Sequence, residues 1–188
     1  MIKKINTKYI FFDRDGTLNL DPGYISSVSK FNLYKDVIDA LKLLSMNNFK
    51  FFLITNQSGI GRGLITLKEL EKIHKKFDLL LMDNNLKFEN KYFCPHLPSD
   101  KCKCRKPEVE MFLKASNEYN FNISESVVIG DSDKDIMVAK KIGALSILVK
   151  TGEGSLAFEK LQKLKIKPDF VGENLYQCAL FLTRGLKF

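Results

Sequence analysis

The chain has 188 residues, of which 45% are hydrophobic, so we expect residues 1–188 to form a single domain with a full core. No stretch approaches the roughly 20 apolar residues of a membrane span, and Asp13 interrupts the apolar start before a secretory signal could form, which favours the cytoplasm. The net charge of +8 fits a solvated basic surface, and it also leaves nucleic acid or a small anionic substrate open.

Strands and helices alternate along the chain. In chain order, the pattern predicts a strand at 9–12, a helix at 36–46, a strand at 50–55, a helix starting at Thr66, a strand at 90–93, a helix starting near Pro107, a strand at 127–129, a helix from Lys134 ended by Gly143, strands at 145–149 and 170–171, and a helix at 175–182. Thr66 and Glu69 have the spacing of a capping box. This order predicts an α/β fold whose parallel sheet carries helices on both faces.

Two carboxylates lie at the end of the first strand, in the run Phe12-Asp13-Arg14-Asp15-Gly16. Open α/β sheets bind ligands at the carboxyl ends of their strands. The pair could therefore face a metal ion and a phosphoryl group. Asp-x-Asp-Gly also ends strands as an ordinary turn, in which Asp bonds its own main chain and Gly takes a positive φ. The motif therefore needs support from elsewhere in the chain.

Three further segments follow predicted strands and should lie at the same edge. They are the polar run Thr55-Asn56-Gln57-Ser58, the cations Arg105 and Lys106, and Gly130-Asp131-Ser132. Asp133, just beyond, is a candidate helix cap. Together the segments suit phosphoryl chemistry, and the carboxylates of Asp13, Asp15 and Asp131 are the hard oxygen ligands that Mg²⁺ prefers.

A second signal is a cluster of metal-ligand residue types, Cys94, His96, Cys102 and Cys104. Three thiols and one imidazole match a closed structural zinc site, although chance clustering of reduced cysteines is the alternative. Cys104 lies two residues before Lys106, so zinc would help to fix that lysine. Outside the cluster, we expect Cys178 in the core and His74 on the surface.

Taken together, the motifs resemble those of phosphatases of the haloacid dehalogenase (HAD) superfamily. Asp13-x-Asp15-Gly16-Thr17 matches the first motif, and Thr55, Lys106 and Gly130-Asp131 with Asp135 match the second, third and fourth. The resemblance implies a HAD-like Rossmannoid sheet, an aspartyl-phosphate on Asp13, and Asp15 as acid and then base. Thr55 and Lys106 would hold phosphate oxygens. The role of Asp135 stays open.

Within the superfamily, the Cys/His loop resembles that of two families, the phosphatases of D-glycero-D-manno-heptose 1,7-bisphosphate and those of histidinol phosphate. The runs around Gly23-Tyr24 and Asn56-Gln57-Ser58-Gly59 are closer to the heptose enzymes, which remove the 7-phosphate. That resemblance implies a small phosphorylated sugar as substrate, with contacts from Asp21, Pro22, Gly23, Tyr24, Thr55, Asn56, Gln57, Ser58, Arg105, Lys106 and Ser132. Arg105 would recognise its distal part.

The stretches 18–49 and 59–104 are too short to hold a separate cap domain, so we expect a capless monomer. An open site leaves a polynucleotide end phosphatase as a lesser alternative. A zinc-bearing nucleic-acid binding module with an inactive phosphatase core is another, which predicts steeply salt-sensitive binding and no phosphate release. The intact Asp13 and Asp15 pair argues against the latter.

Overall fold

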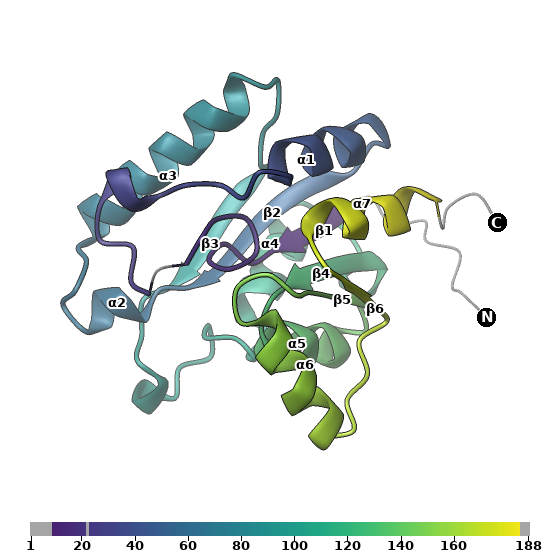
Figure 1. The fold of residues 1–188 in the computed structure, drawn as a ribbon. Helices are drawn as coiled ribbons and strands as arrows, with labels where there is room; N and C mark the ends of the chain where they lie inside the picture. The colour runs from purple at the N-terminus through teal and green to yellow at the C-terminus, as the bar shows by residue number, and fades with distance from the viewer. Residues whose placement is uncertain (1–8, 22, 185–188) are drawn as a thin grey trace.

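The structure, a computed structural model that describes residues 9–21 and 23–184, is built on a six-stranded sheet in which all pairs are parallel (Figure 1). The strands are β1 (Tyr9–Phe12), β2 (Lys50–Asn56), β3 (Asn90–Cys94), β4 (Ser126–Gly130), β5 (Leu145–Val149) and β6 (Phe170–Gly172). Their order is β3-β2-β1-β4-β5-β6. The connections therefore reverse direction between β1 and β4, which is where ligands bind in such sheets.

Helices cover both faces of the sheet, as predicted, with α1, α3 and α7 above and α5 and α6 below in Figure 1. The helices are α1 (Val37–Met46), α2 (Ser58–Gly61), α3 (Leu67–Met82), α4 (Glu110–Glu118), α5 (Asp133–Ile142), α6 (Gly154–Lys163) and α7 (Leu175–Arg184). Short 3-10 turns lie at Val28–Lys30, Pro98–Asp100 and Ile123–Glu125. Side chains of α4 pack on the same face as those of α5.

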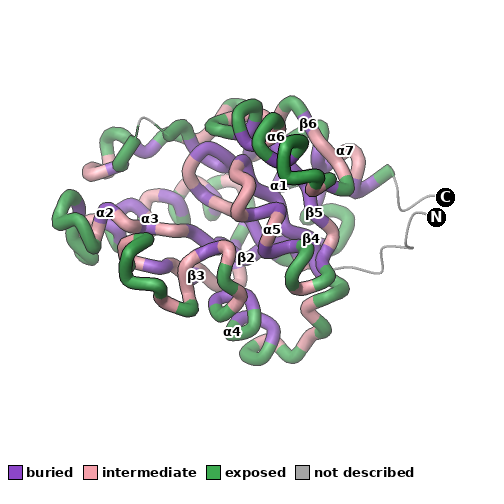
Figure 2. Tube along the Cα trace, turned by 90° about the horizontal axis from the view of Figure 1, so that it is seen from below, coloured by how far each residue is buried: buried purple, intermediate pink, exposed green. Residues whose placement is uncertain are grey.

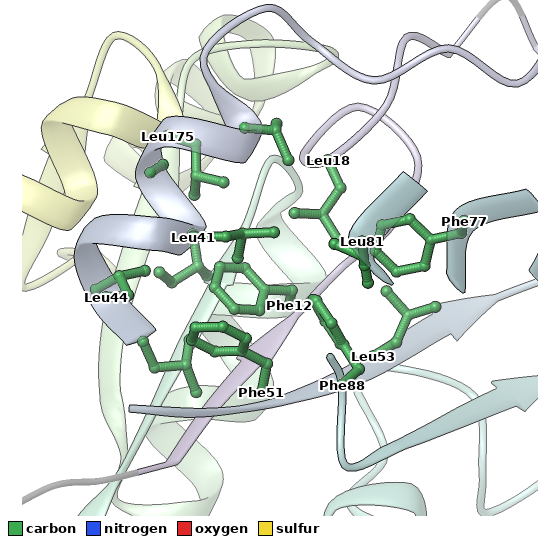
Figure 3. Close-up of a cluster of buried hydrophobic side chains, with 14 of the residues drawn as sticks. Phe12, Leu18, Leu41, Leu44, Phe51, Leu53, Phe77, Leu81, Phe88 and Leu175 are labelled. Atoms are coloured by element: carbon green, nitrogen blue, oxygen red, sulfur yellow. The ribbon is translucent and has the colours of Figure 1, made fainter. Parts of the chain in front are cut away.

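The core is divided by the sheet because successive strand residues point to opposite faces. Ile10 and Phe12 of β1 belong to the cluster under α1, α3 and α7, whereas Phe11 belongs to the cluster under α4 and α5. Figure 3 shows the first cluster, in which Phe12 lies between Leu41 of α1 and Phe88. Buried residues fill the centre and exposed ones form the outside (Figure 2). The residues just beyond β1 are thus held from both sides.

Most predicted elements are present within a residue or two of their expected ends. The Thr66 and Glu69 capping box is formed, and Gly143 ends α5 with a φ of 71°. Helix α6 was not predicted, and α4 begins at Glu110 rather than near Pro107. His74 is not a surface residue: it is half-buried, and its Nε2 is enclosed. None of the helices in the described residues is both long and apolar enough to cross a membrane.

Helix α1 offers a matched test of this core. Leu41 is fully buried, whereas Met46, on the same helix, is 82% exposed. Leu41→Ala should lower the free energy of unfolding by about 2 to 5 kcal/mol, because it leaves a cavity between α1 and the sheet. Met46→Ala should change it by less than about 0.5 kcal/mol. Urea unfolding of both variants checks the difference; equal losses would contradict the packing described.

Candidate active site

The carboxyl edge of the sheet carries a cleft with a volume of about 310 Å³. Residues that follow β1, β2 and β4 meet there, as the strand order requires. Among the predicted site residues, the cleft is lined by Asp13, Asp15, Asp21, Gly23, Tyr24, Thr55, Asn56, Gln57, Ser58, Arg105, Lys106, Asp131 and Ser132. Pro22, also a predicted contact, lies outside the described residues. The cleft therefore gathers segments that are more than 100 residues apart in sequence.

Lys106 is the buried cation of the site. Its Nζ lies 2.7 Å from Asp13 Oδ1 and 2.6 Å from Asp135 Oδ1, and it donates a hydrogen bond of 2.9 Å to the Ile54 carbonyl. Burial lowers the pKa of Lys106, but the two carboxylates outweigh it and raise that pKa overall. Lys106 is therefore a fixed positive charge, paired with Oδ1 of Asp13.

Asp131 is packed against two glycines. A Cβ on Gly16 or Gly152 would lie 2.0 or 2.1 Å from Asp131 Oδ2, so only glycine fits at either position. Both glycines also have positive φ, at 79° and 56°. Thr17 Oγ1 donates to Asp131 Oδ1 over 3.3 Å, and the Glu153 amide donates to Oδ2 over 2.8 Å. These contacts hold the carboxylate beside the end of β1.

Asp13, Asp131 and Asp135 form an acidic cluster whose ligand oxygens all lie within 4.8 Å of one another. Burial, together with the neighbouring carboxylates, raises the pKa of Asp13 to about 7 and that of Asp131 to about 8. Three carboxylates and one lysine carry excess negative charge in a buried place. Such a set of hard oxygen donors fits a divalent cation, and Mg²⁺ is the common choice in phosphoryl sites.

This acidic cluster contains two of the three expected magnesium ligands, Asp13 and Asp131. Asp135 belongs to the acidic cluster, whereas the Asp15 carboxylate is held elsewhere. Arg14 binds both oxygens of Asp15 at 3.0 and 2.8 Å, Asn19 donates over 2.9 Å, and Gln57 donates over 2.7 Å. Burial raises the pKa of Asp15, but Arg14 and the amide hydrogen bonds outweigh it, so that pKa lies below its ordinary value.

The polar residues after β2 have different partners. Asn56 uses both amide atoms on the main chain of Lys106, accepting from its N–H at 3.0 Å and donating to its carbonyl at 3.2 Å. Gln57 Nε2 donates to Thr55 Oγ1 over 2.8 Å as well as to Asp15. Thr55 therefore keeps its hydroxyl hydrogen for another acceptor. Asn56 therefore holds the main chain of Lys106 in addition to lining the cleft.

The Cys94, His96, Cys102 and Cys104 side chains come together as a second ligand cluster. The sulfur-sulfur distances are 3.1 to 3.5 Å, and His96 Nδ1 lies 3.2 Å from Cys104 Sγ and 3.6 Å from Cys94 Sγ. A tetrahedron with zinc-ligand bonds of about 2.0 to 2.3 Å has edges of roughly 3.4 to 3.8 Å. Three of the five distances, at 3.5 to 3.6 Å, match these edges and the other two are 0.2 to 0.3 Å shorter, and three thiols with one imidazole are donors that zinc takes.

Several residues of the site were missed or given another role in the sequence analysis. Lys134 lines the active-site cleft and also a neighbouring basic cavity of about 530 Å³, as Arg105 does. Ser132, not Asp133, is the N-cap of α5, and Asp133 pairs with Lys160 at 2.6 Å. The motif Gly-Asp-x-x-x-Asp drew attention to Asp135, but its ion pair with Lys106 depends on the folded chain.

Comparisons with known proteins agree with this geometry. The HAD-hydrolase-like family model matches residues 103–178. The chain is 39% identical to a D-glycero-beta-D-manno-heptose-1,7-bisphosphate 7-phosphatase of Yersinia pestis over 77% of this chain and 81% of the relative. It is 38% identical to the enzyme of that name from Helicobacter pylori strain J99, over 69% and 75% of the two chains.

One solved structure is also similar. It is D,D-heptose 1,7-bisphosphate phosphatase from B. bronchiseptica, complexed with magnesium and phosphate. The TM-score is 0.88 at 30% identity, and the match covers 95% of this chain and 99% of that one. The likeness therefore extends to the whole sheet and its helices.

The Lys106 ion pairs generate a stability prediction. Asp135→Asn should lower the free energy of unfolding by about 3 kcal/mol, because it removes one charge from a buried pair while Lys106 keeps Asp13. The matched control is Glu173→Gln, which removes the exposed pair with Lys150. That change should cost less than about 1 kcal/mol. Urea unfolding measures both; a smaller loss for Asp135→Asn than for the control would contradict the buried pair.

Proposed function

This chain belongs to the HAD-like hydrolases, in the family of the heptose 1,7-bisphosphate phosphatases, and from that premise we propose that it removes the 7-phosphate of D-glycero-D-manno-heptose 1,7-bisphosphate. The observation that carries the proposal is the position of Asp13. Its carboxylate stands at the end of β1, in the cleft, with Lys106 on one oxygen and Asp131 beside it.

In the proposed reaction, Oδ2 of Asp13 attacks phosphorus while Lys106 holds Oδ1. An acyl-phosphate bond forms as the bond to the sugar oxygen breaks, and Asp15 gives that oxygen its proton. Water then attacks the acyl-phosphate, Asp15 takes a proton from it, and Asp13 is released with phosphate. Lys106 and the Thr55 hydroxyl would stabilise the negative charge on the phosphoryl oxygens.

The environment of Asp15 suits an alternation between acid and base. Arg14, Asn19 and Gln57 favour its ionised form in the free enzyme, which is the form that accepts a proton from water. A phosphate group brought into the cleft adds negative charge nearby, which raises the pKa of a carboxyl. The substrate itself would therefore help Asp15 to hold the proton that the leaving oxygen needs.

Magnesium would be held by Asp13 and Asp131, with Asp135 beside them. When bound, it would screen the repulsion between the Asp13 carboxylate and the phosphate. The Asp15 carboxylate, first expected as a third ligand, already accepts four hydrogen bonds. We therefore assign Asp15 to proton transfer.

The rest of the substrate would lie along the cleft rim. Gly23, Tyr24, Ser58 and Ser132 line it. We assign the distal phosphate to Arg105, with Lys134 next to it, because both line the cleft and neither has a salt bridge within the described residues. An open cleft without a cap suits this small bisphosphate. We expect a monomeric enzyme of the cytoplasm.

Phosphate release should be measured from heptose 1,7-bisphosphate and from histidinol phosphate, in parallel, with magnesium. We expect turnover of the bisphosphate and little turnover of histidinol phosphate, because the relatives of this chain are heptose 1,7-bisphosphate 7-phosphatases. Asp13→Asn should lower kcat by more than about a thousandfold, because it removes the nucleophile.

Two results would oppose the proposal. Normal turnover by Asp13→Asn would exclude the covalent route. Binding of DNA or RNA without magnesium, and without any phosphate release, would favour the nucleic-acid binding module instead.

We also propose that zinc binds Cys94, His96, Cys102 and Cys104 and supports Lys106 without touching the substrate. Cys104 is two residues from Lys106, and Arg105, between them, donates to the His96 carbonyl over 3.3 Å. A rigid cluster at this point would restrict the main chain that carries the lysine.

Cys102→Ser should reduce bound zinc and lower kcat/KM by about tenfold, because the supporting loop is loosened. Metal analysis of the purified protein measures the zinc, and phosphate release measures activity. Cys178→Ser is the matched control, since Cys178 is a buried residue of α7 and does not belong to the cluster. Full activity in a folded, zinc-free Cys102→Ser protein would contradict the supporting role.

A further inference from the structure

Three buried side-chain atoms lack a hydrogen-bond partner within residues 9–21 and 23–184. They are Arg14 Nη1, Asn19 Oδ1 and His74 Nε2. Two of them belong to residues that hold the Asp15 carboxylate. An unpaired buried polar group costs about 1 to 3 kcal/mol, and more when it is charged, so such a grouping beside one carboxylate calls for an explanation.

Arg14 and Asn19 are each committed to Asp15 through their other atoms. Arg14 is 1% exposed, and its Nε and Nη2 bind the two oxygens of Asp15. Asn19 is 0% exposed, and its Nδ2 donates to Asp15 and to the Leu20 carbonyl. The two N–H groups of Arg14 Nη1 and the side-chain carbonyl of Asn19 are thus left over, on residues that bind the same carboxylate.

His74 supplies a second acceptor from helix α3. Its ring packs edge-on against Phe93, with 6.3 Å between ring centroids. Burial, with the nearby charges of Arg14 and Lys91, lowers the pKa of His74 to about 3, although Asp15 acts in the opposite direction. The imidazole is therefore neutral at neutral pH, and its one acceptor nitrogen is Nε2 when Nδ1 carries the hydrogen.

We propose that one internal water joins these three atoms and that His74 thereby acts as a positioning residue for Asp15. A water has two donors and two acceptors. It can accept from Arg14 Nη1 while donating to Asn19 Oδ1 and to His74 Nε2, which gives it three partners, the usual number for buried water. This contact would fix the guanidinium of Arg14, whose other nitrogens bind Asp15. The inference rests on the proposed role of Asp15 in phosphate-ester hydrolysis.

The test compares two leaving groups. A sugar oxygen needs a proton from Asp15 as it departs, whereas p-nitrophenolate leaves without one. His74→Phe keeps a ring against Phe93 but removes the acceptor. We expect it to lower kcat/KM about tenfold for heptose 1,7-bisphosphate and less than about twofold for p-nitrophenyl phosphate, because general acid catalysis contributes roughly 10² to 10⁴ and is only partly lost.

His74→Gln is the matched variant, since its amide oxygen can replace Nε2 as acceptor. It should restore kcat/KM for the bisphosphate to within about twofold of the unaltered enzyme. Equal losses on both substrates, no loss in His74→Phe, or no recovery in His74→Gln would each overturn the proposal. The ratio kcat/KM is used because it does not depend on the later hydrolysis of the phosphoenzyme.

A crystal structure of the unaltered protein tests the water directly, even if His74→Phe fails to fold. We expect one ordered water within hydrogen-bond distance of Arg14 Nη1, Asn19 Oδ1 and His74 Nε2. A dry site would overturn the proposal. Absence of phosphate release from the unaltered enzyme on either substrate would instead count against the proposed function, while the water would remain observable.

Discussion

The site depends on one buried cation. Lys106 lies between Asp13 and Asp135 and donates to the carbonyl of Ile54, so it ties the ends of β1 and β2 to the start of α5. The neighbouring carboxylates of Asp13 and Asp135, which are largely buried, would repel each other without it. The positive charge of Lys106, 2.7 Å from Asp13 and 2.6 Å from Asp135, offsets that repulsion.

The chain around Lys106 is itself held from two directions. Asn56 binds both main-chain polar groups of the lysine, and the Cys/His cluster lies immediately before it in sequence. The main-chain N–H of Gln57 also donates to the Cys94 carbonyl over 2.7 Å, which joins the end of β2 to the cluster. A loop that carries a buried charge needs such support, because it lacks the regular hydrogen bonds of a helix or strand.

The two carboxylates of the first motif have opposite environments, although only Arg14 separates them in sequence. Asp13 faces other acids and a lysine, and its pKa is raised; Asp15 faces donors, and its pKa is lowered. The difference lies in their partners: buried Arg14 holds both oxygens of Asp15, whereas Lys106 pairs with Asp13. The roles proposed for Asp13 and Asp15, nucleophile and acid-base group, rest on this difference of surroundings.

The sequence by itself determined the features that depend on near neighbours or on a simple period. These include the strand ends that carry Asp13, Thr55 and Asp131, the capping box at Thr66 and the cysteine-histidine cluster. Helix α6 was missed because Thr151-Gly152-Glu153-Gly154 has the composition of a turn. The helix is stabilised by the packing of Ala157 and Leu161 against Ile136 and Leu148.

Tertiary structure alone decided which side chains meet. It placed Asp135 rather than Asp15 in the acidic cluster, turned the Asn56 amide onto Lys106, and enclosed Nε2 of His74. The physical reason is that these contacts join residues far apart in sequence: Asn56 and Lys106 are 50 residues apart, and Asp13 and Asp135 are still farther apart. Their distances are set by how helices and strands pack, which no local pattern records.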